Sequence, residues 1–400
     1  MSQREHGPLR GVRILDLTRV LAGPYASGLL ADMGADVIKI ENPSEPDGTR
    51  ASHPLVNGVS NHFINFNRNK RSVPIDLSVD KGRELFLKLV ATADVVVENY
   101  RPGVMKSLGL SYETLSAIND QIILCSISGF GQTGSFRGKP AYDVIVQAMS
   151  GAMSVTGEPG GEPVRLGIPM GDLSGGVFGA IGILAALHDR TISGKGQSID
   201  VSMLDGLTHL MLYYSVDYLN AGMIAGPVGG RHNHIAPYGV LPVSDGYLVL
   251  AIFTKKFWLL YCEAIGRPDL VVDERFLTTA SRLTNKDALY PILEEEMKKR
   301  SQVEWTEVFD KAGLPFAPML TVDQVAEHPL FREREMFVET VHPVAGPVYV
   351  TGRPIKFPNR EPFEISPAPQ LGEHSDEVLS ELLGLDAQQI ESLRADGVIL

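Results

Sequence analysis

The chain has 400 residues, more than one compact hydrophobic core usually holds, so we expect two domains or one large elaborated domain. Its composition, 44% hydrophobic and 21% charged residues, is typical of a globular protein. With 36 basic and 48 acidic side chains, the net charge at pH 7 is −12, which argues against general binding to nucleic acid or anionic membranes. An anionic small ligand in a locally basic pocket stays compatible with this charge.

The two cysteines, Cys125 and Cys262, lie far apart in apolar stretches. They predict buried free thiols, and they offer neither a disulfide framework nor a metal site. The N-terminal segment lacks the apolar core of a signal peptide. The longest apolar run, at 177–187, is broken by glycines and falls short of the roughly 20 residues that a membrane span needs. We therefore expect a cytoplasmic protein that binds no membrane.

The first hundred residues alternate between predicted strands and helices. A β-rich run at 12–17 precedes a helical pattern at 24–33, which has Pro24 in its first turn and Gly34 just beyond its end. With a second strand at 36–41, this predicts a right-handed unit with parallel strands. The pattern recurs with a helix at 85–90 and strands at 72–77, 94–98 and 122–126. Together these elements predict an open, doubly wound, Rossmann-like parallel sheet of the α/β class.

Further along, small residues predict a close-packed helix at about 173–190, followed by a strand at 197–201 and a helix at about 203–219. The character of the sequence then changes near Gly226. Two apolar runs flank Ser244-Asp245-Gly246 and predict a β-hairpin at 237–241 and 247–251, with amphipathic helices at about 255–265 and 286–300. We predict a large domain at 1–225, completed by 326–400, and a smaller α+β domain at 226–325.

Several motifs of other chemistries are absent from the sequence. The turn after the first strand reads LAGP at 21–24 in place of GxGxxG, so a dinucleotide site is not predicted. There is no GxxxxGK[ST] phosphate loop and no GxSxG elbow of a serine hydrolase. His232 and His234 lie two residues apart without a third ligand nearby, so we expect them to have a structural or supporting role and predict no metal site.

Basic residues gather in two segments beside predicted strands. The cluster NRNKR at 67–71 is either a solvated loop or a clamp for phosphate oxygens. Arg101 and Lys106 follow the strand at 94–98, and ligands of open α/β sheets bind beyond the carboxyl ends of strands. The two segments together indicate an anionic ligand.

The segment GIPMGDLSGG at 167–176 is the most informative in the chain. By its spacing alone, Asp172 is an N-cap of the glycine-rich helix that follows it. A carboxylate at a helix N-terminus is also held ionised by the helix dipole, and Gly171, Gly175 and Gly176 leave space for a bulky ligand. Those properties equally describe a nucleophile, so the residues alone leave both interpretations open.

Nearly the whole chain resembles the class III CoA-transferases, a family that includes formyl-CoA transferase and carnitine CoA-transferase relatives. The resemblance runs through ILDLTRVLAGPYASGLLADMGADVIKIE, NRNKRSVPIDL, DVVVENYRPGVM, SGFGQTG, YDVIVQAMSG, GDLSGG, GKGQSIDVSMLD and LGEHSDEVL. It implies acyl-CoA and small carboxylates as substrates, with no permanently bound cofactor. It also implies an interlocked homodimer of two ring-shaped chains.

The resemblance assigns roles to individual residues. Asp172 occupies the family's nucleophile position, where it forms a mixed anhydride with the donor acyl group and then an aspartyl-CoA thioester. We expect backbone N–H groups near Gly175 to stabilise the oxyanions. The implied CoA-contacting residues are Asn69, Lys70, Arg71, Ile75, Leu77, Asn99, Arg101, Lys106, Lys139 and Tyr142. The residues expected near the transferred acids are Leu21, Asp143, Arg231, His232 and His234.

Two alternative functions fit the same fold. The α-methylacyl-CoA racemases share the aspartate but pair it with a histidine, and this chain has Tyr142 at that position. A tyrosine is not easily protonated at neutral pH, so this favours the transferase. A more distant alternative is a CoA-ester-binding protein that has lost catalysis, against which the intact Asp172 argues.

The residues around the expected acid site depart from formyl-CoA transferase. That enzyme has a glutamine at the position of Leu21 and a glycine-rich loop where this chain reads GGRHNH at 229–234. We therefore do not expect oxalate or formate as the substrate. Arg231, His232 and His234 are candidate partners for the distal carboxylate of a dicarboxylic acid such as succinate.

Overall fold

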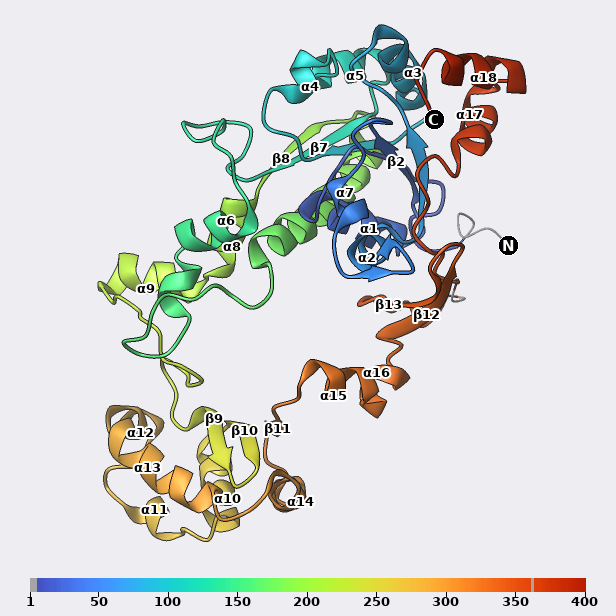
Figure 1. Cartoon of the computed structure of the whole chain (residues 1–400). Helices are drawn as coiled ribbons and strands as arrows, with labels where there is room; N and C mark the ends of the chain where they lie inside the picture. Colours follow the sequence, from blue (N-terminus) through green and yellow to red (C-terminus); the bar gives the residue numbers. More distant parts are fainter. Residues whose placement is uncertain (1–5, 361–362) are drawn as a thin grey trace. The chain divides into compact units, whose positions relative to one another are not determined.

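The computed structural model describes residues 6–360 and 363–400 (Figure 1). The chain forms two compact units. The first comprises Met1–Ala152, Arg165–Leu212 and Pro329–Leu400, and the second comprises Met153–Val164 and Tyr213–His328. The domain boundaries expected near residues 225 and 325 stay a prediction.

Within the described residues, six strands form the central sheet of the first unit. They are β1 (Arg13–Asp16), β2 (Asp36–Glu41), β5 (Lys70–Pro74), β6 (Val95–Glu98), β7 (Ile123–Ser128) and β8 (Ser198–Ser202). Their order is β5-β2-β1-β6-β7-β8, and every neighbouring pair is parallel. The order reverses beside β1, as in a doubly wound fold. This confirms the predicted open α/β sheet.

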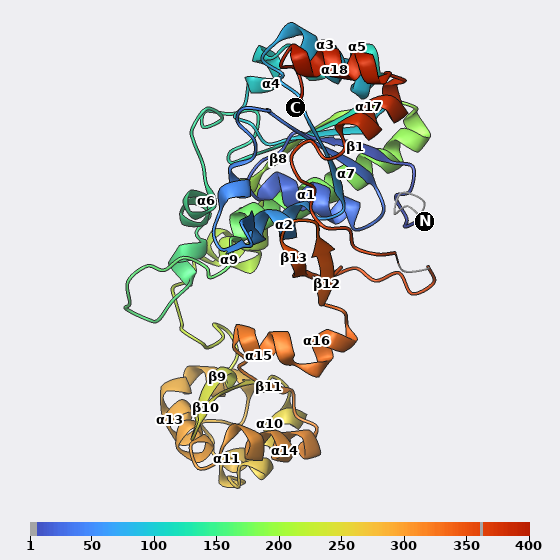
Figure 2. The same cartoon turned by 45° about the vertical axis from the view of Figure 1, so that its right-hand side comes forward.

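One face of this sheet is covered by α1 (Ala22–Ala31) and α7 (Met170–Ser193), with α2 (Asn61–Asn67), α6 (Asp143–Met149) and α8 (Met203–Leu210) beside them (Figures 1 and 2). Glycines bring α7 close to its neighbours. A Cβ atom added at Gly179 would lie 2.7 Å from the side chain of Ile127 in β7, and one at Gly176 would lie 2.8 Å from the carbonyl oxygen of Ala22. The predicted small-residue helix therefore has the close backbone contacts that its composition indicated.

The opposite face carries α3 (Asp80–Val90), α5 (Tyr112–Ile118), α17 (Ser375–Leu383) and α18 (Ala387–Ala395). Side chains alternate along β1, so Leu15 and Leu17 point into this core while Ile14 and Asp16 face α1. Helix α3 contributes one apolar face to the same core, consisting of Leu85, Phe86, Leu89 and Val90.

The rest of the first unit consists of short elements. These are α4 (Val104–Ser107), α16 (Pro329–Glu333), a 3-10 helix at Gly48–Ala51, the ribbon of β3 (Leu55–Val56) with β4 (Val59–Ser60), and the hairpin of β12 (Phe337–His342) with β13 (Gly346–Thr351). Val348 and Val350 of β13 pack against Ile64 of α2, so the C-terminal hairpin joins the first unit.

Helix α7 is long and apolar enough to cross a membrane by length and composition alone. From the sequence, a helix was predicted at about 173–190, but its apolar run at 177–187 was considered too short to span a membrane. Half of its most apolar window is buried inside the chain, where it packs against α1, β7 and β8. A core helix of a soluble protein passes the same test, so this is weak evidence for a membrane segment.

The second unit contains a small antiparallel sheet and several helices. Its strands β9 (Tyr238–Val243), β10 (Gly246–Ala251) and β11 (Phe316–Pro318) pair in the order β11-β10-β9, which confirms the predicted hairpin. Trp258, Tyr261, Leu293 and Phe309 are buried in its core. The helices are α9 (Tyr213–Ala221), α10 (Lys255–Ala264), α11 (Asp269–Val272), α12 (Thr279–Thr284), α13 (Lys286–Met297), α14 (Gln302–Ala312) and α15 (Val322–Glu327).

The single helix predicted at 203–219 is wrong. The structure has α8 and α9 instead, separated at Leu212. Leu212 has a φ of 41°, which lies in the left-handed region and ends a right-handed helix. Leucine is a good helix former, so the sequence pattern carried no signal for this break.

Candidate active site

Asp172 is the third residue of α7, not its cap. The helix begins at Met170, and Pro169 occupies the N-cap position. The helix is capped instead by Asp143 of α6, whose carboxylate accepts hydrogen bonds from the backbone N–H of Gly171 at 2.7 Å and of Asp172 at 3.3 Å. The N-cap interpretation of Asp172 is therefore wrong, and in the described part of the chain its carboxylate has no hydrogen-bond partner.

The environment of Asp172 raises the pKa of its carboxyl group above the value in water. Burial of the half-buried side chain, and then the neighbouring negative charge of Asp143, raise the pKa of Asp172 to about 6. At neutral pH the group is still mostly ionised, but its carboxylate is poorly solvated. A basic, weakly solvated carboxylate is a stronger nucleophile than an exposed aspartate.

Asp143 is itself held in place by a buried glutamine. Gln147, one turn later in α6 and fully buried, donates from Nε2 to Asp143 at 2.6 Å, and its Oε1 accepts from the N–H of Leu166 at 2.8 Å. Gln147 was not predicted from the sequence, although its spacing of four residues from Asp143 was a usable signal for a side-chain pair on one helix face. Tyr142 directly precedes this pair as the N-cap residue of α6, and its side chain is 72% exposed.

The oxyanion contact expected at Gly175 is not available. Gly175 lies in the second turn of α7, where the backbone N–H is used within the helix. The residue is also buried, and an added Cβ atom there would lie 2.9 Å from Met203 and 3.3 Å from Ile127. A ligand oxygen cannot reach this position.

Several predicted CoA-contacting residues follow the carboxyl ends of the strands. Ile75 and Leu77 follow β5 and are buried. Asn99 follows β6, and its side-chain amide bonds both the N–H and the carbonyl of Arg19 at 2.8 Å. Leu21 is the half-buried N-cap residue of α1. These residues therefore lie at the carboxyl ends of the parallel strands, which is called the carboxyl edge of the sheet below.

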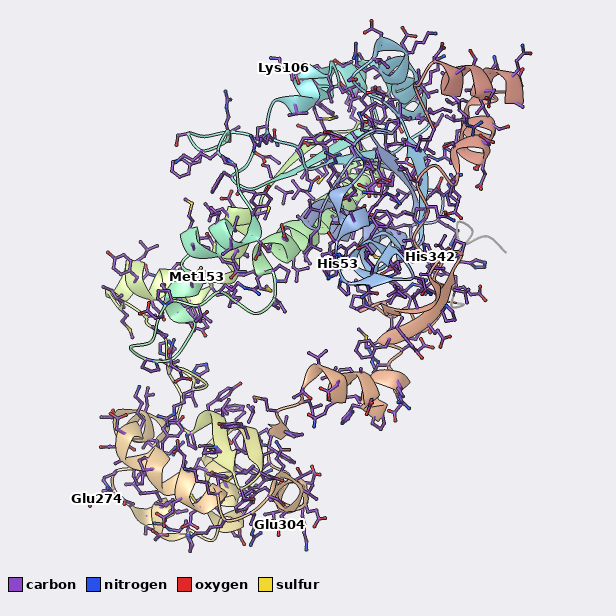
Figure 3. All side chains as sticks on the ribbon, in the orientation of Figure 1. His53, Lys106, Met153, Glu274, Glu304 and His342 are labelled. Atoms are coloured by element: carbon purple, nitrogen blue, oxygen red, sulfur yellow. The ribbon has the colours of Figure 1, made fainter. Side chains whose placement is uncertain are left out.

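Three predicted cations extend into solvent beyond the same strands. Arg101 follows β6, Lys106 lies on α4 (Figure 3), and Lys139 stacks over the ring of Phe136 with 3.5 Å between its ammonium nitrogen and the ring centroid. All three side chains are exposed. They are therefore available to an anionic ligand.

Asn69, Lys70 and Arg71 lie at the opposite, amino end of β5. The Lys70 ammonium is fully buried, 2.8 Å from the Asp16 carboxylate, and Arg71 binds Asp36 at 2.6 Å. Asn69 donates to Asp32 and accepts from the backbone of Ser366, both at 2.8 Å. Their polar groups already have partners within the chain, and the structure does not bring these three residues together with Ile75, Leu77 and Asn99.

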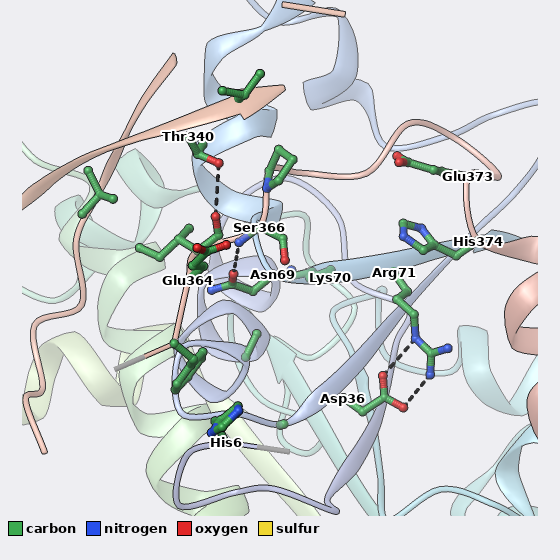
Figure 4. A pocket seen from close by; sticks show the side chains of 18 of the residues that line it. His6, Asp36, Asn69, Lys70, Arg71, Thr340, Glu364, Ser366, Glu373 and His374 are labelled. Atoms are coloured by element: carbon green, nitrogen blue, oxygen red, sulfur yellow. Dashed lines mark hydrogen bonds and ion pairs between the residues drawn. The ribbon is translucent and has the colours of Figure 1, made fainter. Parts of the chain in front are cut away.

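The same three residues line a cavity of about 1070 Å³ at the amino edge of the sheet (Figure 4). In Figure 4 the Arg71 guanidinium is turned toward Asp36, and Asn69 lies beneath Ser366. Asp172 does not line this cavity. Besides Asp36, the cavity is lined by the carboxylates of Glu339, Glu364 and Glu373. This acidic lining does not suit the phosphates of CoA.

Arg231, His232 and His234 belong to the second unit. The Arg231 guanidinium lies 2.9 Å from the Glu294 carboxylate and stacks on the ring of Tyr290. His234 lies 3.5 Å from Asp217, and burial followed by the nearby His234 lowers the pKa of His232. In residues 6–360 and 363–400 no three His, Cys, Asp or Glu side chains are arranged to hold a metal ion.

A buried network of charged side chains beneath the loop after β1 was also not predicted from the sequence. Asp16, Lys39, Asp47 and Lys70 are almost completely inaccessible to solvent and pair in two ion pairs, Lys70–Asp16 and Lys39–Asp47. Lys39 lies between Ile38 and Ile40 in β2, and Asp16 directly follows Ile14 and Leu15 at the end of β1. A charged residue next to such apolar neighbours is the signal that could have indicated buried partners for both.

Nearly the whole chain matches a known protein family. The family model described as CoA-transferase family III matches residues 9–375. The chain is 40% identical over 384 residues to an acetyl-CoA:oxalate CoA-transferase of Acetobacter aceti, which covers 96% of this chain and 97% of that protein. It is 37% identical to a succinyl-CoA:glutarate CoA-transferase of Mus musculus, over 98% of this chain and 90% of that protein.

Among solved structures, the chain is similar to a CAIB/BAIF family protein from Brucella suis. The two share 38% sequence identity with a TM-score of 0.84, over 94% of this chain and all of that one. The family match covers nearly the whole described fold and includes Asp143 and Asp172. The chain therefore belongs to CoA-transferase family III and is an enzyme of this class.

Proposed function

We propose that this enzyme moves CoA from an acyl-CoA donor to a dicarboxylic acid through the carboxylate of Asp172. The observation that carries the proposal is the state of that carboxylate. It lies half-buried in the first turn of α7 without a hydrogen-bond partner in the described residues, and its pKa is raised to about 6. A capped or ion-paired aspartate would be a weaker nucleophile.

The proposed reaction needs no cofactor. A carboxylate oxygen of Asp172 attacks the thioester carbon of the donor. The C–S bond breaks, which releases CoA thiolate and forms a mixed anhydride between Asp172 and the donor acyl group. The thiolate attacks the aspartyl carbonyl carbon, which releases the donor acid and forms an aspartyl-CoA thioester. The acceptor carboxylate then expels the thiolate to form a second anhydride. The thiolate finally attacks the acceptor's carbonyl carbon and frees Asp172.

We assign CoA binding to the carboxyl edge of the sheet. The exposed cations Arg101, Lys106 and Lys139 are suited to the phosphates, because Arg and Lys provide charge-assisted donors. Tyr142 offers an exposed ring beside Asp143. Asn69, Lys70 and Arg71 are left out of this assignment, since their polar groups are bonded within the chain at the other edge.

The acceptor is proposed to be a dicarboxylate, because the relatives from Mus musculus and Acetobacter aceti are named for glutarate and oxalate. Leu21 had argued against oxalate, but a relative that is 40% identical is named for it, so oxalate belongs among the acids to be tested. Arg231 stays a candidate for the distal carboxylate. Within the second unit its guanidinium is paired with Glu294.

We also propose that the enzyme is a cytoplasmic homodimer. Exposed apolar side chains occur along α6 and α7, where a second copy would remove them from water, including Val144, Ile145, Met149, Val177 and Ile181. Light scattering of the purified protein measures this directly. A monomer at micromolar concentration would contradict the dimer.

Covalent labelling tests the mechanism. The enzyme is mixed with succinyl-CoA or acetyl-CoA, treated with hydroxylamine, and digested for mass spectrometry. We expect a hydroxamate on the peptide that contains Asp172, absent in Asp172→Ala and retained in the exposed control Asp120→Ala. If no donor marks Asp172 while a 2-methylacyl-CoA exchanges its α-proton with deuterated solvent, the enzyme is a racemase and the proposal is wrong.

A further inference from the structure

The loop that joins β1 to α1 has an unusual pattern of hydrogen bonds. Five consecutive backbone groups are each hydrogen-bonded to a side chain. They are the N–H and carbonyl of Thr18, the N–H and carbonyl of Arg19, and the N–H of Val20. Asp16 accepts from Thr18, Lys39 donates to the carbonyl of Thr18, and Asn99 bonds both polar groups of Arg19. The loop is therefore fixed by side chains from three strands or their ends.

Val20 is the strained point of this loop. Its φ of 70° lies in the left-handed region, which a β-branched residue almost never adopts. Its side chain is 50% exposed, so burial of the valine does not compensate for this conformation. Strain of this kind persists only where the surroundings enforce it, and it occurs preferentially at functional sites.

Asp47 is the group that holds the Val20 peptide. Its two carboxylate oxygens lie 3.2 and 3.3 Å from the N–H of Val20. The carboxylate also accepts from Lys39 at 3.2 Å and from the N–H and hydroxyl of Thr49 at 3.0 and 2.9 Å, and the residue is 1% exposed. Asp47 is thus buried and bonded to three other residues, and it also caps the 3-10 helix at Gly48–Ala51.

The strained loop lies beside the helix that carries Asp172. Val20 and Leu21 follow the carboxyl end of β1, where the strand order reverses and ligands of such sheets bind. Ala22, the next residue, packs against α7 at Gly176, about one turn beyond Asp172. The loop and the amino end of α7 therefore form adjacent parts of one surface.

We propose that Asp47 is a positioning residue for the transfer reaction. By holding Val20 in its left-handed conformation, it fixes Val20 and Leu21 as a wall against which the acyl end of the donor thioester is aligned with Asp172. This inference rests on the proposed function of Asp172. Asp47 acts through Val20 and does not contact the substrate itself.

The test combines removal of Asp47 with relief of the strain. Asp47→Ala lets Val20 leave the left-handed region, and we expect kcat/KM for the acyl-CoA donor to fall at least about tenfold, because small misplacements of reacting groups are costly. The dissociation constant of free CoA should change less than about threefold, since the exposed cations bind its phosphates. Glycine tolerates the left-handed conformation. Adding Val20→Gly to Asp47→Ala should therefore raise kcat/KM at least about threefold above that of Asp47→Ala alone.

Two further variants keep the result interpretable. Lys39→Met with Asp47→Leu removes both charges together, so no unpaired buried ion remains if Asp47→Ala fails to fold. Asp36→Ala removes a buried carboxylate at the first residue of β2, away from Val20. This variant should keep its kcat/KM, and adding Val20→Gly to it should not raise kcat/KM.

The outcomes separate the two proposals. Absence of CoA transfer by the wild-type enzyme overturns the proposed function, and with it this role of Asp47. Transfer by the wild type, with a loss in the Asp47 variants that Val20→Gly does not reduce, overturns the positioning role alone. Recovery by Val20→Gly of kcat/KM measured per folded molecule supports it, because a general gain in stability would change the amount of folded enzyme and not the activity of each folded molecule.

Discussion

Replacing Asp172 by asparagine should make the folded protein more stable at neutral pH, although it removes the proposed nucleophile. Folding places this carboxylate in a half-buried site next to Asp143, where burial and the second negative charge raise its pKa from 3.8 to about 6. A group with a raised pKa in the folded state stabilises the fold when protonated, and that contribution is lost as the pH rises through the folded pKa. The asparagine variant avoids the loss.

The size of the effect follows from the pKa. Above pH 6 the carboxylate is charged in both the folded and the unfolded chain, and the shift corresponds to about 3 kcal/mol, because each pKa unit is worth about 1.36 kcal/mol. Asp172→Asn should therefore be more stable than the wild type by up to about 3 kcal/mol at pH 7.5. The difference should shrink between pH 6 and pH 4 and vanish below that.

The assay must report on the first unit. Both tryptophans, Trp258 and Trp305, lie in the second unit, so intrinsic fluorescence reports mainly on the wrong part of the chain. Urea titrations followed by hydrogen exchange of peptides from α7 measure the relevant unfolding at each pH. Asp120→Asn, an exposed carboxylate, serves as the control and should change little. Equal stability of Asp172→Asn and the wild type at pH 7.5 would refute the reasoning.

Three other predictions follow from the same geometry. The single-turnover rate of aspartyl-CoA thioester formation at Asp172, followed without hydroxylamine by rapid quenching and intact-protein mass spectrometry, should fall as the pH drops through about 6, because the protonated acid is not a nucleophile; a rate that is flat down to pH 5 would contradict this. Gly179→Leu should lower the unfolding midpoint by an amount equivalent to about 1–3 kcal/mol, because its Cβ atom would lie 2.7 Å from Ile127, whereas Gly138→Ala should cost less, because an added Cβ atom there meets no atom within 4 Å. Burial raises the pKa of the Cys125 thiol to about 12, so the native protein should resist alkylation at pH 8 at this residue and react there only after denaturation.

The sheet was predictable because its strands are local signals. A continuous apolar run is typical of a strand buried on both faces of a parallel sheet, and the predicted segment 36–41 coincides with β2. The break at Leu212 was not predictable, because its cause is a backbone conformation that leucine does not encode.

The basic cluster at 67–71 illustrates what local patterns cannot provide. Lys70 and Arg71 read as exposed phosphate ligands because their neighbours in sequence are polar. In the fold Lys70 is buried against Asp16, and Arg71 meets Asp36 and Glu381, the latter 310 residues away in the chain. Whether a cation is free for a ligand depends on such distant partners, and a single sequence does not reveal them.

Asp172 also depends on a distant partner, but here the tertiary contact leaves the side chain free of a partner among the described residues instead of occupying it. Its spacing predicts a cap, and a capping aspartate would have its charge stabilised by the helix N-terminus. In the fold Asp143 takes the N–H groups of Gly171 and Asp172, so the stabilisation goes to Asp143. Asp172 is left as a second carboxylate near a helix end that is already neutralised, and its pKa rises. One tertiary contact thus converts a residue that local rules assign to helix capping into one suited to nucleophilic attack.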